Sequence, residues 1–413
     1  MHEGRPLSSH VPGLTEQELE VARSAEFDLG AGYPHLPAPE FIRQSYRDDR
    51  LEDLSLMMAP GWTTEKQARL DQDLAEAVEH LLGCTFREAG AELRVTFSGS
   101  VAVDRAIMAC LERARSCGAQ RLEVVTTSPS IDIMRDFLSE RADIDTHFVD
   151  CLNGDDFPRL DLDGVLDALQ RPLPANCRRA ALLTSPENPT GESWSRAQLE
   201  EIAAACRRGG HTLIVDHCFL LAGVQEDLVD AVWQVADPGD DWLAIWDTGK
   251  TFGLNGDKLG FLVASESLLP YVDDVLRVLQ FDVSRRQKLF FSELLRFSSF
   301  YDYVPGLGSI CRANLRTLVT ALEATPCRVL EPKAGSLALV ELPEGQIDTE
   351  TCSYLLRQGV GVVGGSSFFH GDVKRSDLVR VALARDPAHF ARAVDLLRLT
   401  LNDTSHRATV GLG

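Results

Sequence analysis

Short apolar runs alternate with amphipathic stretches between about residues 94 and 265. The apolar runs are rich in Val, Ile, Leu and Thr and are often bounded by Gly or Pro, which is typical of buried β-strands. Between them, apolar residues recur at three- and four-residue spacing, as on one face of an α-helix. The predicted strands are Arg94–Phe97, Arg121–Thr127, Ala180–Thr184, Thr212–Val215, Trp242–Trp246 and Gly260–Ala264. The predicted helices between them are Val101–Arg115, Ile131–Glu140 and Ser195–Arg207.

This alternation of strands and helices predicts an α/β fold with a mostly parallel sheet covered by helices on both faces. An amphipathic helix at residues 66–83 precedes it. After about residue 285 a long helical stretch leads into a smaller α+β set, with strands Ser336–Glu341 and Leu378–Ala384 and a helix near Thr349–Gln358. The predicted organisation is an N-terminal segment (1–60), a large domain (61–285), a smaller domain (286–401) and a tail (402–413).

Composition narrows the class of protein. The chain has 413 residues and a net charge of −21, and long-range repulsion therefore argues against a general nucleic-acid or anionic-membrane binder. No run approaches the ~18–20 apolar residues of a membrane span, and the start lacks the pattern of a signal peptide. The ten cysteines are scattered, with no CxxC pair and no metal-site spacing. We expect reduced thiols, a cytoplasmic location and no metal.

Two segments that follow predicted strands carry candidate ligand-binding groups, because open parallel sheets bind ligands at the carboxyl ends of their strands. Ser98-Gly99-Ser100 opens a predicted helix, where free N–H groups and the helix dipole favour an anion such as phosphate. A plain strand–helix turn explains it equally well. Asn188 lies in the turn Ser185–Gly191, which reads either as a surface turn or as a site for a ligand-facing amide.

Two further strand ends carry charged residues. Asp216 closes an apolar strand, and a carboxylate is costly to bury there unless it is paired. It could cap the next helix or pair with a cationic ring nitrogen. Lys250 follows another apolar strand, and burial would lower its pKa and make it an amine nucleophile or base. For an isolated lysine, an exposed or snorkelling side chain is the simpler interpretation.

Taken together, these motifs are more specific. The order Asn188-Pro-Thr-Gly, then Asp216, then Lys250 resembles that of the pyridoxal-phosphate enzymes of the aspartate aminotransferase superfamily (fold type I), over nearly the whole chain. The resemblance implies a seven-stranded sheet, pyridoxal 5′-phosphate as cofactor, an amino-acid substrate and a homodimer. It further implies that Lys250 forms a Schiff base with the cofactor, that Asp216 pairs with the pyridinium nitrogen, and that Asn188 binds the phenolic oxygen.

The same resemblance assigns the remaining site residues. Arg380 matches the arginine that binds the substrate α-carboxylate, and Lys258 stands where most relatives have a phosphate-binding arginine. The implied phosphate-binding residues are Ser98, Gly99, Ser100, Thr248 and Lys258, and the implied substrate-binding residues are Gly32, Tyr33, Asn188, Arg380 and His370. For His370, a structural role remains open beside the substrate-facing one.

Three departures distinguish this chain from ordinary aminotransferases. Phe219 replaces the usual tyrosine, and Pro129-Ser130-Ile131 offers no aromatic residue to stack on the cofactor, for which His147 or Phe148 could substitute. Asp247-Thr248-Gly249-Lys250 replaces Ser-x-Ser-Lys. These features and Val379–Arg385 resemble a smaller branch, the pyridoxal-phosphate-dependent arginine oxidases and hydroxylases of specialised metabolism. However, Gly30-Ala31-Gly32-Tyr33 stands where that branch carries an Asp and a His.

The resemblance leaves the reaction open. We expect the enzyme to form an external aldimine and a quinonoid in specialised, antibiotic-type amino-acid metabolism. The favoured outcomes are oxidation or hydroxylation, β- or γ-elimination with replacement, and cyclisation. The alternative is an aminotransferase that interconverts an amino acid and a 2-oxo acid. A catalytically inactive binding protein on the same fold is disfavoured, because Lys250 and Asp216 are both present.

Overall fold

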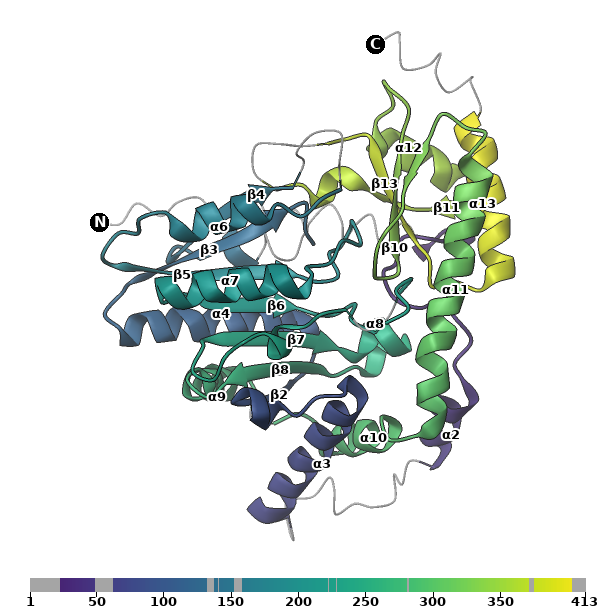
Figure 1. Ribbon diagram of the computed structural model, residues 1–413. Coiled ribbons are helices and arrows are strands. Elements are labelled where there is room, and N and C mark those ends of the chain that lie inside the picture. The colour runs from purple at the N-terminus through teal and green to yellow at the C-terminus, as the bar shows by residue number, and fades with distance from the viewer. Residues whose placement is uncertain are drawn as a thin grey trace, which may run out of the picture.

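The computed structural model describes residues 23–48, 62–131, 137–139, 141–151, 158–221, 223–227, 229–280, 282–370 and 375–402. Within these residues a large and a smaller β-sheet lie side by side, each with helices packed against it (Figure 1). Apart from Asn402, the predicted tail lies outside the described residues. The greater part of the predicted helix Ile131–Glu140 lies outside them as well.

The large sheet has seven strands in the order β2–β8–β7–β6–β5–β3–β4. The five strands from β7 to β4 in this order run parallel, whereas β8 is antiparallel to both of its neighbours. The predicted mostly parallel seven-stranded sheet is therefore confirmed. The strands are β2 (Ala91–Thr96), β3 (Arg121–Ser128), β4 (Ile144–Asp150), β5 (Cys177–Thr184), β6 (Thr212–Asp216), β7 (Trp242–Asp247) and β8 (Gly260–Ser265).

Both faces of this sheet are buried, because alternate side chains of a strand point to opposite faces. In β5, Ala180 and Leu182 pack into one apolar core, and Ala181 and Leu183 pack into the other. Double burial explains why the inner strands read as continuous apolar runs. The helices on the first face are α4 (Gly99–Ser116) and α9 (Leu269–Leu279), and those on the second include α6 (Leu162–Gln170) and α7 (Arg196–Gly209).

The apolar pattern did not predict β4, which lies at the edge of the sheet. Its sequence, Ile-Asp-Thr-His-Phe-Val-Asp, mixes buried and partly exposed positions. An edge strand pairs on one side only and buries less side-chain surface, so its apolar signal is weaker than that of an inner strand.

The smaller sheet is antiparallel and has the order β12–β13–β10–β9. Its strands are β9 (Arg328–Leu330), β10 (Leu337–Glu341), β12 (Val363–Gly364) and β13 (Leu378–Ala382). Three helices share its apolar core: α11 (Ser298–Leu322), α12 (Asp348–Arg357) and α13 (Pro387–Asn402). This is the smaller α+β set that the sequence predicts after residue 285.

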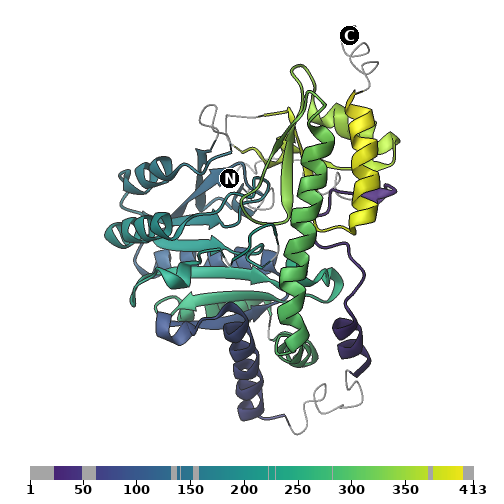
Figure 2. The same cartoon turned by 45° about the vertical axis from the view of Figure 1, so that its right-hand side comes forward.

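Two segments connect the sheets. The 25-residue helix α11 runs from the large sheet along the smaller one (Figure 2). At the other end of the chain, β1 (Phe27–Asp28) pairs in parallel with β11 (Val360–Gly361) beside the smaller sheet, and α2 (Glu40–Asp48) then leads back to the large one.

The predicted domain boundaries remain a proposal. Helix α10 (Arg285–Leu294) packs against α3 (Thr64–Leu82) in the core of the large sheet. We therefore propose that the boundary expected near residue 285 lies later, within α11. Because α11 contributes to the core of the smaller sheet, it would belong to both parts.

Candidate functional site

The predicted site residues meet where the parallel strands of the large sheet end, at their carboxyl ends. In the strand register, Thr184 pairs with Asp216, and Asp247 pairs with Gly260, which in turn pairs with Thr96. The segments that follow these strand ends carry Asn188, Asp216, Lys250 and Ser98–Ser100. A parallel sheet thus brings together residues that are far apart in sequence, as its crossover connections require.

Asp216 is a buried carboxylate at the end of β6. Its Oδ1 accepts a hydrogen bond from the Cys218 backbone N–H at 2.9 Å. Burial raises the pKa of Asp216, hydrogen bonds from Cys218 oppose the rise, and the charge of Asp247 adds to it. Among the described residues, no lysine or arginine forms an ion pair with this carboxylate. A cationic group placed beside it would therefore be strongly favoured.

Lys250 lies in the single-turn helix α8 (Thr248–Phe252), which begins directly after β7. Its Nζ is 5.5 Å from the centroid of the Phe219 ring, and it donates no hydrogen bond to a described residue. Desolvation lowers the pKa of the Lys250 amine, the charge of Asp247 opposes this, and the charges of Lys258 and Arg380 lower the pKa further. A larger fraction of this amine is thus unprotonated and nucleophilic at neutral pH.

Arg380 is a buried guanidinium on β13 of the smaller sheet. Its Nη1 donates to Asn188 Oδ1 at 2.9 Å, and its Nη2 donates to the Gly30 carbonyl at 2.7 Å. The guanidinium lies 4.7 Å from the centroid of the Phe368 ring. The smaller sheet therefore places its arginine against the Asn188 turn of the large sheet.

The N-terminal segment passes between the two sheets at this point. A Cβ built on Gly32 would lie 3.7 Å from both Phe219 and Leu337, which puts Gly32 beside the residue that contacts Lys250. Tyr33 is partly exposed, and its carbonyl accepts a hydrogen bond from Arg385 Nη1 at 2.9 Å.

Sequence reasoning missed the role of Arg385, which appeared only as the end of a motif. This side chain is 1% exposed and donates to the carbonyls of Asp28, Ala31, Tyr33 and Ala384. Burial lowers the pKa of Arg385 to about 10, and the nearby Asp28 opposes this. Arg385 thus holds in place the N-terminal segment, whose Gly30 carbonyl accepts from Arg380.

Ser98, Gly99 and Ser100 form the N-terminus of α4. Ser98 is the N-cap, and its hydroxyl accepts a hydrogen bond from the Val101 N–H at 3.2 Å. A Cβ on Gly260 would lie 2.2 Å from the Ser98 backbone, so glycine is required for this close approach of β8. The helix presents its N–H groups at the same edge of the sheet as Asp216.

Lys258 and Thr248 adjoin this helix N-terminus in different ways. Lys258 Nζ lies 3.8 Å from Asp247 Oδ2, and the side chain is partly exposed. The Thr248 hydroxyl accepts from the Leu259 N–H at 2.9 Å and faces the Leu259 carbonyl at 3.3 Å. The structure thus engages Thr248 in joining α8 to β8.

His370 connects the smaller sheet to the end of β3. Its Nε2 lies 3.1 Å from the Ser130 carbonyl, its backbone N–H donates to Ser128 Oγ, and the Ser128 hydroxyl donates back to the His370 carbonyl. Its ring lies 5.3 Å from that of Phe148, one of the two residues considered for stacking. These contacts give His370 a structural role.

Two buried titratable residues beside the site were not predicted to act in it. Glu187 precedes Asn188, burial raises its pKa well above the usual range, and its Oε2 accepts from Thr127 Oγ1 at 3.3 Å. His217 follows Asp216, and burial lowers its pKa to about 4. Nδ1 of His217 lies 2.8 Å from the Ser185 carbonyl, and Nε2 accepts from the Val232 N–H at 3.3 Å. His217 is therefore neutral and structural.

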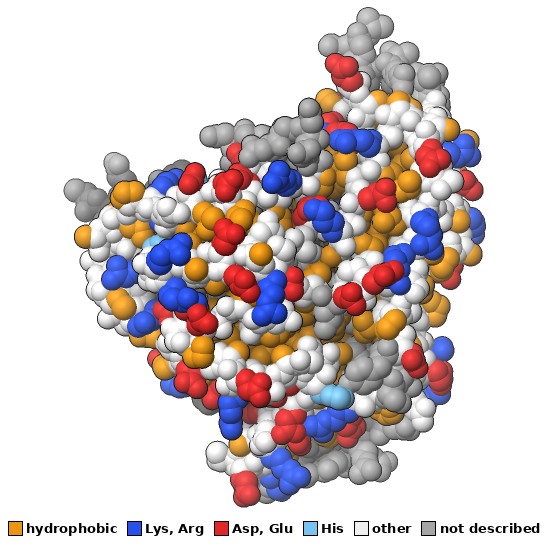
Figure 3. Space-filling view, viewed as in Figure 1, with side chains coloured by type: hydrophobic (Ala, Val, Ile, Leu, Met, Phe, Trp, Pro, Cys, Tyr) orange, Lys and Arg blue, Asp and Glu red, His pale blue; other side chains and the backbone are white. Residues whose placement is uncertain are grey.

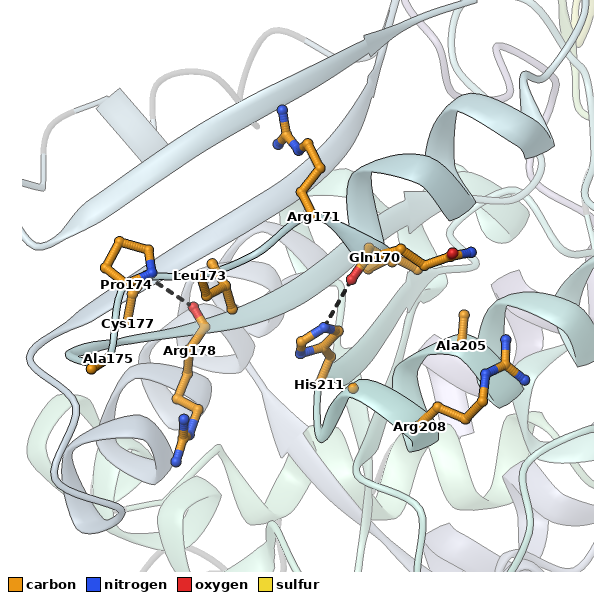
Figure 4. Close-up of a pocket in the computed structure, with 12 residues that line it drawn as sticks. Gln170, Arg171, Leu173, Pro174, Ala175, Cys177, Arg178, Ala205, Arg208 and His211 are labelled. Atoms are coloured by element: carbon orange, nitrogen blue, oxygen red, sulfur yellow. Dashed lines mark hydrogen bonds between the residues drawn. The ribbon is translucent and has the colours of Figure 1, made fainter.

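Figure 4 shows a different pocket, of about 540 Å³, at the opposite edge of the sheet. It lies near Cys177, where β5 begins, and near His211, which precedes β6. The labelled arginines Arg171, Arg178 and Arg208 point away from one another and share no common focus (Figure 4). This pocket contains none of the predicted site residues. No cluster of His, Cys, Asp and Glu suited to a metal ion occurs among the described residues.

The residues at the strand ends fit pyridoxal 5′-phosphate. The buried Asp216 carboxylate has no cationic partner among the described residues, and the Lys250 amine has no hydrogen-bond partner there. The N-terminus of α4 and the Lys258 ammonium offer positive charge to a phosphate. One group that carries an aldehyde, a cationic ring nitrogen and a phosphate would satisfy all three places.

Comparisons with known proteins show the family of this chain. The model of the family "Aminotransferase class I and II" matches residues 27–397. A histidinol-phosphate aminotransferase of Methanococcus aeolicus is 25% identical over 226 residues, which cover 54% of this chain and 56% of that protein. The chain thus matches about half the length of the first such relatives.

Two further relatives match over most of their length. The methionine aminotransferase of Escherichia coli K12 is 22% identical over 96% of both chains. The crystal structure of YbdL from Escherichia coli, for which a methionine aminotransferase function was identified, superposes with a TM-score of 0.76 at 19% identity, over 94% of this chain and 98% of that one. MppP, whose structure was determined with its product 2-ketoarginine, superposes with a TM-score of 0.68 at 19% identity, covering 90% and 99% of the two chains. At this level of identity the superpositions establish the fold.

Proposed function

The chain belongs to the class I and II aminotransferases, which depend on pyridoxal 5′-phosphate, and we propose that it acts on an α-amino acid in a reaction other than amine transfer. The reactions in this class are oxidation or hydroxylation, elimination with replacement, and cyclisation. We place the enzyme in specialised, antibiotic-type metabolism. The observation that supports this proposal is the phenyl ring of Phe219 beside the Lys250 amine.

We assign the cofactor contacts residue by residue. When bound, pyridoxal 5′-phosphate withdraws electrons from the substrate Cα. The Lys250 amine would hold the cofactor aldehyde and then move the Cα proton. The Asp216 carboxylate would hold a proton at the ring nitrogen. Because Asn188 Oδ1 accepts from Arg380, its Nδ2 is left to donate to the phenolic oxygen. The N-terminus of α4 at Ser98–Ser100 and the Lys258 ammonium would bind the phosphate.

The substrate would be held from the side of the smaller sheet. The buried, planar guanidinium of Arg380 suits a substrate carboxylate. The contacts of Arg380 with Asn188 and Gly30 fix the guanidinium plane, so the bound carboxylate would orient the Cα–H bond toward Lys250. Gly32 would line the substrate cavity through its contact with Phe219. Tyr33 and His370 remain proposals as substrate neighbours.

Phe219 bears on the fate of the proton that Lys250 removes. Amine transfer requires Lys250 to return this proton to the cofactor carbon C4′, next to the substrate nitrogen. A tyrosine at position 219 would hydrogen-bond the amine or the phenolic oxygen and orient the transfer. Phe219 offers no such hydrogen bond, and the Lys250 amine has none to another described residue. Slower proton return leaves time for oxidation, loss of a side-chain group or ring closure.

We also propose that the enzyme is a homodimer, as members of the family typically are. Three exposed apolar side chains favour this: Phe97 at 47% exposure, Val278 at 87% and Leu279 at 50%. The Gln280 side chain donates to the Val95 carbonyl at 2.8 Å, which brings the end of α9 close to the end of β2. We propose that these side chains form one apolar surface beside Ser98. The cytoplasmic location remains a prediction.

A screen of amino acids by absorbance, with product mass spectrometry under air and under nitrogen, tests the proposed reaction. Loss of a side-chain group, ring closure or oxygen consumption, each with the cofactor unchanged after turnover, is the expected result. Stoichiometric conversion of the cofactor to its amine form, with release of a 2-oxo acid, would instead select the aminotransferase. The likeness to methionine aminotransferase favours that second candidate. Sulfonium and guanidinium amino acids belong in the screen because the chain carries a net charge of −21.

A further inference from the structure

A carboxylate lies where the phosphate of the cofactor is expected to bind. Asp247 ends β7 and is 3% exposed. Its Oδ2 accepts a hydrogen bond at 2.7 Å from the backbone N–H of Gly99, which is the first residue of α4. Its Oδ1 accepts one at 2.6 Å from the backbone N–H of Gly249. We propose that Asp247 is an internal anion that competes with the cofactor phosphate for the N-terminus of α4 and thereby sets the affinity for the phosphorylated cofactor.

The local backbone is shaped around this carboxylate. A Cβ on Gly249 would lie 2.7 Å from Asp247 Oδ1, and a Cβ on Gly99 would lie 3.3 Å from Asp247 Oδ2. Glycine at both positions lets the carboxylate approach the two N–H groups closely. The contact is therefore built into the site from three segments, and it is not a chance rotamer of an exposed side chain.

The charges around α4 explain why the contact matters. Lys258 lies 3.8 Å from Asp247 Oδ2, so one positive charge is already paired with one negative charge. For a phosphate group with close to two negative charges, Asp247 thus offsets the charge of Lys258, and the helix N-terminus adds only a partial positive charge of roughly half a unit. In addition, the Gly99 N–H is a single donor and cannot serve two strong acceptors fully. A bound phosphate must therefore either displace the Asp247 oxygen from the Gly99 N–H or bind against its negative charge.

This inference rests on the proposed assignment of the α4 N-terminus to the cofactor phosphate. It goes further by assigning a restraining role to Asp247. The cofactor would be retained chiefly by its covalent bond to Lys250, with the phosphate contributing less than in relatives that carry serine at this position. The enzyme would consequently discriminate only weakly between pyridoxal phosphate and pyridoxal.

Binding of the two aldehydes to the full-length protein tests this role. Protein freed of cofactor is titrated with pyridoxal phosphate and with pyridoxal, and the ratio of their dissociation constants is compared in the wild type, Asp247→Asn and Asp247→Ser. Asn and Ser are both good N-cap residues, so each can keep the hydrogen bond to Gly249 that starts α8. We expect both substitutions to raise the preference for pyridoxal phosphate over pyridoxal at least tenfold.

Asp257→Asn is the matched control. This substitution also removes one negative charge next to Lys258. The Asp257 carboxylate, however, accepts hydrogen bonds from the Tyr46 hydroxyl and from Gln287 instead of from α4. The control should leave the ratio within twofold of the wild type, and inorganic phosphate should compete more strongly in both Asp247 variants. A ratio that stays unchanged or falls in either Asp247 variant, or that rises equally in Asp257→Asn, overturns the inference while leaving the proposed function intact. If borohydride fixes neither aldehyde to Lys250 in any of the proteins, both proposals fail.

Discussion

At the scale of single residues, burial shifts the pKa values of the titratable groups and so favours one protonation state of each. Burial lowers the pKa of Lys250 and raises those of Asp216 and Glu187. His217, adjacent to Asp216, has its pKa lowered to about 4 and is held by two backbone groups. A reactive residue and a structural one thus differ less in burial than in whether their polar atoms already have partners. Lys250 has none among the described residues, whereas both ring nitrogens of His217 have one.

Lys250→Ala should remove the covalent attachment of the cofactor, because no other amine is proposed to reach its aldehyde. After borohydride reduction and digestion, mass spectrometry should find the added cofactor mass on the Lys250 peptide of the wild type and none in the variant. Lys333→Ala is the control, since Lys333 is an exposed lysine paired with Glu192 at 2.6 Å. Cofactor fixed to another lysine in the Lys250 variant would refute the assignment.

Arg380→Lys should weaken amino-acid binding at least tenfold, with a smaller effect on kcat. A lysine lacks the planar pair of donors that holds a carboxylate and the Asn188 amide at once. The dissociation constant of the amino acid identified by the screen is measured from the absorbance change. Arg375→Lys serves as the control, because Arg375 shortly precedes the same strand, β13, but pairs with Asp377 and Glu341. Equal effects of the two substitutions would argue against the carboxylate role.

His217 should make the protein less stable in mild acid. The unfolded chain binds a proton at this histidine below about pH 6.5, but the folded protein resists protonation until about pH 4. The unfolded state therefore binds more protons in this window, and the free energy of unfolding falls as the pH falls, by up to about 3 kcal/mol. Urea unfolding of cofactor-free protein at pH 4.5 and 6.5 should show a smaller pH dependence for His217→Gln than for the wild type. The exposed His80→Gln should leave that dependence unchanged.

At the scale of elements, the ends of β5, β6 and β7 supply most of the site, and the N-terminal segment closes it from the other side. The strand ends could be predicted because each follows an apolar run that the sequence shows plainly. The path of the N-terminal segment could not, because β1 has only two residues and its partner β11 lies more than 300 positions away. Arg385 fixes that path by donating hydrogen bonds to backbone carbonyls. Every residue type carries a backbone carbonyl, so the sequence does not indicate which of them accept.

Arg385→Lys should loosen the segment that contains Gly30 and Ala31. The wild-type guanidinium donates four hydrogen bonds from a buried position, and a lysine cannot reproduce their planar arrangement. The expected cost is roughly 2–4 kcal/mol, so amide exchange over residues 27–36 should speed up at least tenfold. Arg328→Lys, which changes an exposed arginine paired with Glu341 on the smaller sheet, should leave this exchange unaltered. Unchanged exchange in the Arg385 variant would show that the β1–β11 pair alone holds the segment.

At the scale of the whole molecule, two sheets share one site and α11 joins them. Acidic and basic side chains are interspersed on the face shown in Figure 3, so the net charge of −21 does not gather into one acidic patch there. None of the described helices combines the length and the apolarity needed to cross a bilayer. The positive groups that we assign to the site, Lys250, Lys258 and Arg380, come from the ends of two large-sheet strands and from the smaller sheet, so the positive charge of the site depends on local geometry and not on the net charge.

The apolar surface formed by Phe97, Val278 and Leu279 should hold the proposed dimer together. In sedimentation-velocity experiments the wild type should have twice the 45.4 kDa mass of the chain. The double substitution V278E/L279E should shift it to the monomer, because two buried, unpaired carboxylates oppose association. Leu399→Glu is the control, since Leu399 is equally apolar and 56% exposed but lies on α13. A wild-type monomer would contradict the proposed dimer, and a dimeric double variant would assign the interface to another surface.

The fold class and the strand ends that carry Asn188, Asp216 and Lys250 could be predicted from the amino-acid sequence, because buried strands and their terminal turns are local patterns with a strong apolar signal. The cofactor family followed from the resemblance of these motifs to a known superfamily. The pairing of the polar groups became visible in the tertiary structure alone: the Asp247 carboxylate with the Gly99 N–H, 148 positions away, and Arg385 with the Asp28 carbonyl, 357 positions away. Such contacts depend on how segments distant in sequence pack against one another, and the residues that make them carry no local sequence pattern.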